Sequence, residues 1–148
     1  MVTIKKELYL CIMNNTRFAT VIHILTLLAK FPGQWLSSEC ISESISINPV
    51  VVRKELAVMH QLGWVVSKKG KDGGTMLNVS SAEISMADIF NAVKNSNVLG
   101  KKNTCNDTKC VVGKEINKEL EKLFEETDRI VTESLSNKTL QEFVDQFQ

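Results

Sequence analysis

Apolar residues recur every three or four positions between residues 17 and 30, which is the spacing of an amphipathic helix. Ile24 and Leu27 add a second apolar strip, so we expect this helix to be buried on two sides. The dipeptide Pro32-Gly33 predicts where the helix ends. Residues 1–12 precede it as an N-terminal extension to which the pattern assigns no element.

Two shorter helices with a tight connection are predicted next. Ser37 is suited to cap a helix over residues 38–44, and Asn48-Pro49 to begin another, because Asn is a strong N-cap and Pro favours the first helical position. Gly63 ends the second helix, which has a basic outward face and this apolar seam: Val52, Leu56, Met59 and Leu62. Such a pair indicates a helix-turn-helix.

A basic-tipped hairpin is predicted directly after the second of these helices. Residues 64–67 form one strand, residues 68–74 the turn and residues 75–79 the return strand. Gly73-Gly74 lies between two strands and lacks the spacing of a phosphate-binding loop, so we interpret it as part of the turn. A hairpin in this place is typical of the wing of a winged helix.

The last third of the chain is predicted to be helical again. Ser85 and Asp88 are placed as a capping box for a helix that runs to about Asn95. A long helix over residues 111–135 would extend about 37 Å, and a short helix over residues 140–147 follows. A small domain cannot cover the apolar stripe of so long a helix, so we expect a second copy of the chain to do so: Val112, Ile116, Leu120, Leu123, Phe124, Val131 and Leu135.

These elements predict a mainly α fold with a small β-hairpin. The expected organisation is an extension (1–12), a winged helix-turn-helix domain (13–95), a cysteine-containing loop (96–110), and a dimerisation helix with a C-terminal helix (111–148). A length of 148 residues fits one such domain with one long appended helix.

The net charge of +1 favours no partner, but the charges are segregated. The acidic residues gather after residue 114, whereas the basic ones cluster on the predicted second helix and wing: Arg53, Lys54, Lys68, Lys69 and Lys71. No segment has the roughly 18 apolar residues of a membrane helix, and the start does not resemble a signal peptide, so we expect a cytoplasmic protein without membrane contact. In that compartment the four cysteines are not expected to form structural disulfides.

Double-stranded operator DNA is the partner that this basic cluster predicts. Lys and Arg gain affinity by displacing counterions from phosphates, while side chains in the major groove contact bases. Helix N-termini such as that at Ser37 and Ser38 also bind phosphate. The predicted DNA-binding residues are Ser37, Ser38, Asn48, Val50, Arg53, Lys54, Lys68, Lys69, Lys71 and Gly73.

Several strings resemble the IscR/NsrR/CymR-type family of bacterial winged-helix transcription regulators. The resemblance covers about residues 13–145 and is carried by residues 17–19, 45–51, 62–65, 69–75, 83–89 and 110–113. Among them are Arg17-Phe18-Ala19, Leu62-Gly63-Trp64-Val65 and Cys110-Val111-Val112-Gly113. The resemblance implies a homodimer that pairs through the long helix and binds a palindromic operator as a regulator, which we expect to be a repressor.

Some members of that family hold an iron–sulfur cluster on three cysteines. Cys105 and Cys110 correspond to two of these ligands, but residues 97–100 are Asn, Val, Leu and Gly where the first is expected. We therefore expect no cofactor or metal, and instead a thiol response at Cys110, where a helix N-terminus and Lys109 favour the thiolate. Cys105 or Cys11 would be its resolving partner.

Two alternatives remain open at this point. One is a cluster-sensing regulator of the same family, and the other is a winged helix that serves as a protein-interaction module without DNA. No nucleophile–base pair stands out, so we do not expect an enzyme. Cys40, on the inner side of its short helix, is expected to be a small buried residue.

Overall fold

A computed structural model describes the backbone of residues 2–104 and 109–147, and side chains from Thr16 onward. The fold is mainly helical with one two-stranded antiparallel hairpin, as predicted. Its elements in chain order are α1 (Val2–Lys30), α2 (Ser38–Ile45), α3 (Pro49–Gln61), β1 (Val65–Lys68), β2 (Gly74–Leu77), the 3-10 turn η1 (Ser81–Glu83), α4 (Met86–Val93), α5 (Val111–Ser136) and α6 (Leu140–Val144).

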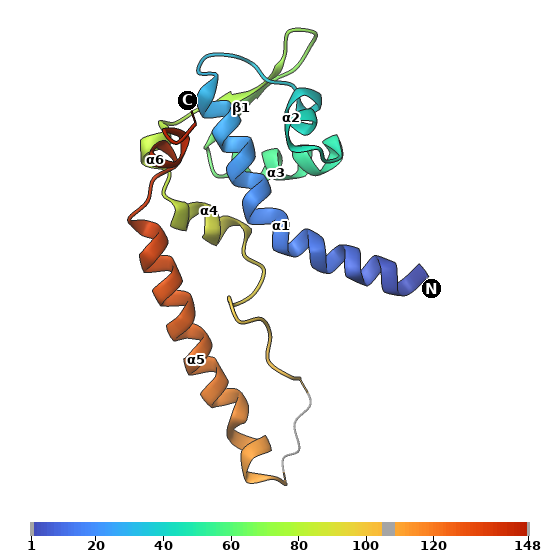
Figure 1. Cartoon of the computed structure of the whole chain (residues 1–148), viewed down its shortest axis with the longest axis vertical. Coiled ribbons are helices and arrows are strands. Elements are labelled where there is room, and N and C mark those ends of the chain that lie inside the picture. The colour runs from blue at the N-terminus through green and yellow to red at the C-terminus, as the bar shows by residue number, and fades with distance from the viewer. Residues whose placement is uncertain (1, 105–108, 148) are drawn as a thin grey trace.

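Helix α1 is the central element of the fold. It packs against α2, α4, α6 and strand β2, and the two-sided burial predicted for it is confirmed by Val21, Ile24 and Leu25 in the core. The helix does not begin at Arg17, because no Pro or Gly interrupts residues 2–16 and the helix continues through them. Figure 1 shows this first part of α1 extending away from the rest of the molecule.

The caps that the sequence predicts are present. The Ser37 hydroxyl accepts a hydrogen bond from the Cys40 amide at 3.1 Å. The Asn48 side chain accepts one from the Val50 amide at 2.9 Å, with Pro49 at the first position of α3. Ser85 and Asp88 form the predicted capping box of α4. Local side-chain chemistry therefore fixes where the helix-turn-helix and the following helix begin.

The wing is attached to the body through the backbone of Leu36. Its amide donates to the Thr75 carbonyl at 3.0 Å, and the Thr75 amide donates back to the Leu36 carbonyl at 2.8 Å. Gly74 adopts a φ of +152°, and a Cβ there would lie 2.6 Å from the Leu36 carbonyl oxygen. Only glycine permits so close an approach, so this contact fixes the hairpin beside α2.

Three further details differ from the sequence-based expectation. Leu62 is 46% exposed because α3 ends at Gln61 and the chain turns at Gly63 with a φ of +76°. Cys40 is exposed, because Ile41 and Ser42 take the inward positions of α2. Helix α6 ends at Val144, three residues earlier than predicted.

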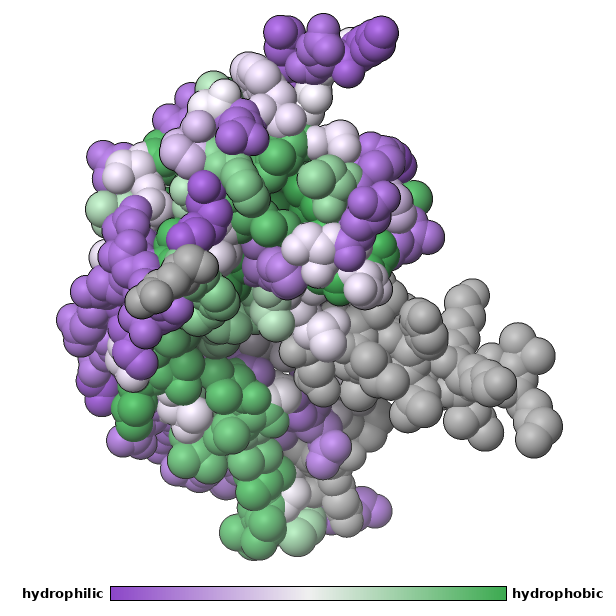
Figure 2. Space-filling view, turned by 45° about the horizontal axis from the view of Figure 1, so that its top comes forward, coloured by the Kyte–Doolittle hydropathy of each residue, from purple (hydrophilic) through white to green (hydrophobic). Residues whose placement is uncertain are grey.

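Helix α5 leaves much of its apolar stripe uncovered. Of its residues only Phe124 is buried, where α5 packs against α4. The exposed apolar residues include Val111 at 82%, together with Val112, Ile116, Leu123 and Ile130. Figure 1 shows the helix running away from the hairpin, and Figure 2 shows a hydrophobic band over that lower part of the molecule. Within the described residues, no helix combines the length and apolarity needed to cross a membrane.

A buried ion pair connects α1 to α3. Glu55 is only 3% exposed, and both of its carboxylate oxygens accept from Arg17 Nε, at 2.8 and 3.0 Å. The same guanidinium donates through Nη1 to the Val93 carbonyl at 3.2 Å, at the end of α4. One side chain thus holds together three helices.

Loss of this pair should destabilise the fold. We expect Arg17→Ala to lower the free energy of unfolding by about 3 kcal/mol, because it leaves the buried Glu55 carboxylate without its cation. Urea denaturation followed by circular dichroism measures the change. The control is Arg129→Ala, which removes an exposed pair with Glu133 and should cost about 0.5 kcal/mol or less. Equal effects of the two substitutions would show that the Arg17 pair is not a structural constraint.

Candidate nucleic-acid interface

The solvent-exposed face of α3 carries the side chains of this helix that the sequence predicts to contact DNA. Val50, Arg53 and Lys54 are all exposed, because the opposite face of the helix places Val52, Glu55, Leu56 and Met59 in the interior. The Asn48 side chain is also exposed, but its oxygen is occupied by the cap of α3. The N-terminal half of α3 therefore presents two cationic side chains and one apolar side chain to solvent.

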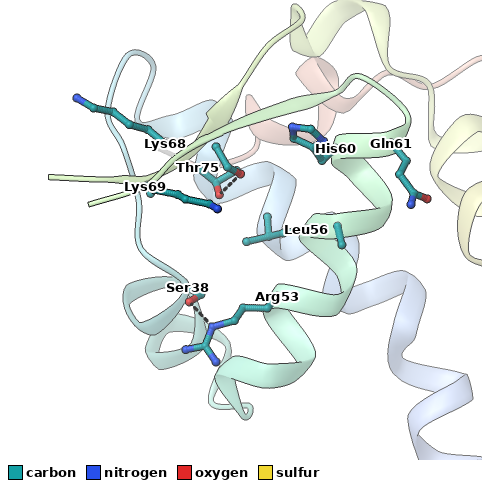
Figure 3. Close-up of a pocket in the computed structure, with 11 residues that line it drawn as sticks. Ser38, Arg53, Leu56, His60, Gln61, Lys68, Lys69 and Thr75 are labelled. Carbon is teal, nitrogen blue, oxygen red and sulfur yellow. Dashed lines mark hydrogen bonds between the residues drawn. The ribbon is translucent and has the colours of Figure 1, made fainter. Parts of the chain in front are cut away.

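A groove of about 660 Å³ separates α3 from the wing. Figure 3 shows the wing strands on one side of it, α3 on the other and the start of α2 at its base. Lys69 extends from the wing toward α3, while Lys68 points the other way and lies with Nζ 5.9 Å from the centre of the Trp35 ring. The groove is lined by Ser38, Arg53, Leu56, Ala57, His60, Gln61, Ser67, Lys68, Lys69, Gly74 and Thr75.

The structure brings four of the predicted site residues to this groove and leaves the others outside its lining. Ser38, Arg53, Lys68 and Lys69 line it. Outside it are Lys54 on α3 and Lys71 at the wing tip, both exposed. The Ser37 hydroxyl caps α2 by accepting a hydrogen bond from the Cys40 amide. The start of α2, the exposed face of α3 and the wing strands thus line one groove.

Gly73 has a structural reason to be glycine. A Cβ at this position would lie 2.2 Å from the Lys68 carbonyl oxygen, and its amide donates to the Gly70 carbonyl at 3.1 Å. Any side chain would therefore force the wing turn open. Its predicted contact with DNA stays a prediction, whereas its effect on the shape of the turn follows from this geometry.

Glu39 is an element of this surface that the sequence analysis did not assign to it. In the first turn of α2, its carboxylate accepts a hydrogen bond from Arg53 Nη2 at 2.5 Å, while Arg53 Nε donates to Ser38 Oγ at 3.1 Å. A hydrogen bond from its own backbone amide, followed by those from Arg53 and Ser38, holds the pKa of Glu39 below its ordinary value. This contact depends on the angle between α2 and α3, which the sequence does not give. The sequence does show a Glu two residues after an N-cap serine, which places a carboxylate at the start of α2.

Neither Cys40 nor Cys110, the two cysteines whose side chains the structure describes, lines the groove. Cys110 is the exposed N-cap residue of α5, without a side-chain capping hydrogen bond. Cys105 falls outside the described residues, and for Cys11 only its place in α1 is described. Within the described part of the chain, no three His, Cys, Asp or Glu side chains are grouped so that they could hold a metal ion.

The sequence around Cys110 does not supply the usual set of thiol ligands for an iron–sulfur cluster. Residues 97–100, where a first ligand would be needed, form a tight turn in which the Gly100 amide donates to the Asn97 carbonyl at 2.9 Å. Asp128 holds that turn through the Val98 amide at 2.8 Å and the Asn97 side chain at 3.1 Å. With Cys105 and Cys110 as the only thiols of this region in the sequence, the donor set is two short of the usual four.

Comparisons with known proteins agree with this architecture. YwnA of Bacillus subtilis (strain 168), whose name places it among the HTH-type transcriptional regulators, is 33% identical over 130 residues, which are 88% of this chain and 96% of YwnA. The structure of T. potens IscR covers 90% of this chain and 86% of its own, with a TM-score of 0.65 and 21% identity. That of CymR, the global cysteine regulator of B. subtilis, covers 90% and 96%, with a TM-score of 0.66 and 19% identity.

The two structural likenesses establish the winged-helix fold, and the family assignment rests on the sequence. The Rrf2 family, described as iron-dependent transcriptional regulators, matches residues 14–146. The family and the relative YwnA are described as regulators of transcription and not as enzymes. The chain therefore belongs to the Rrf2 family of transcriptional regulators.

Proposed function

We propose that the chain is a cytoplasmic, sequence-specific DNA-binding regulator that occupies its operator as a homodimer and acts there as a repressor. One observation carries the proposal: Arg53 on the exposed face of α3 and Lys68 and Lys69 of the wing line a single groove. Winged-helix regulators place the recognition helix in the major groove, so the wing of this chain would reach the adjacent backbone and minor groove.

Each group has a distinct part in the proposed contact. Arg53 would contact base edges, because a guanidinium can donate two parallel hydrogen bonds to guanine. Lys54 and Lys69 would neutralise phosphates and release counterions. The N-terminus of α2 at Ser37 and Ser38 would donate backbone amides to a phosphate. The wing lysines, Lys68 and Lys71 among them, would supply affinity that is independent of sequence.

Salt-dependent binding tests this mechanism. An operator is first selected from a random duplex library with the wild-type protein, and its affinity is then measured by fluorescence anisotropy at several salt concentrations. We expect Arg53→Ala to weaken binding roughly tenfold by removing a base contact. Lys69→Ala should reduce the slope of log K against log salt by about 1.

The matched control for these substitutions is Lys114→Ala. Lys114 is exposed on α5, so the variant loses one positive charge away from the groove and should keep the wild-type affinity and slope. An affinity that does not depend on salt would contradict the phosphate mechanism. Absence of DNA binding at low salt would favour a protein-interaction module instead.

The exposed stripe of α5 supports the homodimer. Apolar residues at 36% to 82% exposure are spread from Val111 to Ile130 on a helix of 26 residues, and a monomer leaves this stripe in water. Pairing two copies along it would bury both stripes at once, with the gain in free energy that apolar burial brings. The pairing would also place two recognition helices for the two halves of a palindrome.

Charges on this stripe should separate the two copies. We expect the double substitution Ile116→Asp with Leu123→Asp to convert the dimer to a monomer, because two carboxylates per chain would have to be buried in the interface. Sedimentation velocity measures the change. The control, Glu125→Ala, lies nine residues after Ile116 and hence on the opposite face of the helix, so it should remain a dimer. A wild-type protein that sediments as a monomer would contradict the proposal.

Cys110 is the thiol through which we propose that oxidants modulate DNA binding. It is exposed at the N-terminus of α5, so oxidants have access to it and a change there would act at the end of the proposed dimer helix.

We expect the operator affinity of the wild-type protein to change at least severalfold after peroxide treatment and to recover after reduction by dithiothreitol, with Cys110→Ser indifferent to both. Anisotropy of oxidised and reduced protein measures this difference. The control is Cys40→Ser, which removes the other exposed thiol of the described residues and should leave the response intact. If the Cys110→Ser protein responds like the wild type, Cys110 is not the sensor.

A further inference from the structure

Arg53 is not a freely moving cation in this structure. Its Nε donates to Ser38 Oγ at 3.1 Å and its Nη2 to Glu39 Oε1, and Figure 3 shows the first of these bonds at the edge of the groove. A guanidinium carries five N–H donors, so donors remain for a further partner. Ser38 and Glu39 at the N-terminus of α2 therefore hold the Arg53 side chain in one orientation, and some of its N–H donors remain available for another partner.

The pair places a negative charge on a surface that is otherwise suited to polyanions. The groove lining includes no acidic residue among those described, and Glu39 stands directly beside it, next to Ser38 in sequence and against Arg53 in space. Hydrogen bonds from its own amide, Arg53 and Ser38 hold the pKa of Glu39 below its ordinary value, which favours the charged carboxylate further. Glu39 and Arg53 side chains are 58% and 54% exposed, and an exposed ion pair contributes little to folding. The contact is therefore better suited to a role in binding than to one in stability.

We propose that Glu39 is a specificity-determining residue that keeps Arg53 off the DNA phosphates and reserves it for a guanine. This inference rests on the proposed DNA-binding function and adds to it a residue that selects among sequences. A phosphate that approached the Nη2 edge of the Arg53 guanidinium, where Glu39 is bound, would meet the Glu39 carboxylate, so two like charges would crowd one guanidinium. Guanine presents O6 and N7, which are neutral acceptors, and does not meet that repulsion.

The same carboxylate can itself contribute to the choice of base. Glu accepts a hydrogen bond from the exocyclic amine of cytosine, whereas it finds no such donor on thymine, which presents the O4 acceptor instead. An Arg and a Glu held side by side therefore match a G·C pair and penalise other pairs. Glu39 would therefore disfavour the wrong base pairs as much as it favours a G·C pair. Many specific interfaces distinguish their partners in this way.

A substitution that removes the charge of Glu39 but keeps the size of its side chain tests this inference. Glu39→Gln keeps a side-chain oxygen but no charge, so Arg53 would become free to contact phosphates on any duplex. We expect the affinity for scrambled DNA to rise about three- to tenfold and its salt dependence to steepen by about 0.9, the amount for one added phosphate contact. The ratio of operator to scrambled affinity should fall roughly tenfold, the loss of one base-specific contact.

The control carries the same charge change elsewhere. Glu125→Gln on the exposed face of α5 should alter neither the ratio nor the slope. Base-pair substitutions along the operator then locate the effect: one G·C pair in each half-site should lose its discrimination in Glu39→Gln, and the same pair should lose it in Arg53→Ala.

The outcomes separate this inference from the proposed function. If the wild type binds its operator selectively but Glu39→Gln leaves the ratio unchanged, or weakens both duplexes equally, the role of Glu39 is overturned and the proposed function stands. If the two variants lose discrimination at different base pairs, the role of the pair is likewise overturned. If the wild type itself does not distinguish operator from scrambled DNA, the proposed function falls, and this inference with it.

Discussion

The orientation of the recognition helix depends on one buried carboxylate and its cation. An ionised Glu55 at 3% exposure would cost several kcal/mol without a partner, and Arg17 of α1 satisfies both of its oxygens. Because Glu55 must face Arg17, the helical period places Arg53 and Lys54 toward solvent. The charged residues of α3 thus have two roles. Glu55 attaches the helix to the core, and this attachment leaves Arg53 and Lys54 exposed. Together with the buried apolar residues of α3, this salt bridge across 38 residues of sequence determines which face of the helix is exposed.

A continuous series of polar contacts leads from this pair to the long helix. Arg17 also donates to the Val93 carbonyl, where α4 ends, and the turn that follows is held by Asp128 of α5 through the Val98 amide. The position of α5 relative to α3 is therefore set by directional hydrogen bonds as well as by the packing of Phe124. For a dimer that pairs along α5, such rigidity would matter, because the spacing of the two recognition helices has to match the helical repeat of DNA.

The parts of the fold that could be predicted are those specified by local chemistry. Ser37, Asn48 and Ser85 cap the helices that the sequence assigned to them, because the spacing of a cap and its amide does not depend on tertiary structure. The meeting of Arg53 and Lys69 at one groove was also predictable, since it follows from the order of elements in a winged helix. Contacts that require an angle between helices could not be predicted: Arg17 with Glu55, and Glu39 with Arg53. The predictions for Cys40 and Leu62 were wrong for a related reason. The burial of each residue depends on which way α2 faces or where α3 ends, and the tertiary structure decides both.

The distribution of charge explains how a chain of net charge +1 can still be suited to DNA. Figure 1 shows α5, which carries seven of the seventeen acidic residues, extending away from the hairpin. At physiological ionic strength charges are screened over about 8 Å, so a phosphate at the groove would respond to Arg53, Lys69 and Glu39 and hardly to the distant acids. A nearly neutral chain gains little from long-range steering toward any polyanion. Its selectivity must then come from short-range contacts at the groove, where one carboxylate among cations has the largest effect on which duplex is preferred.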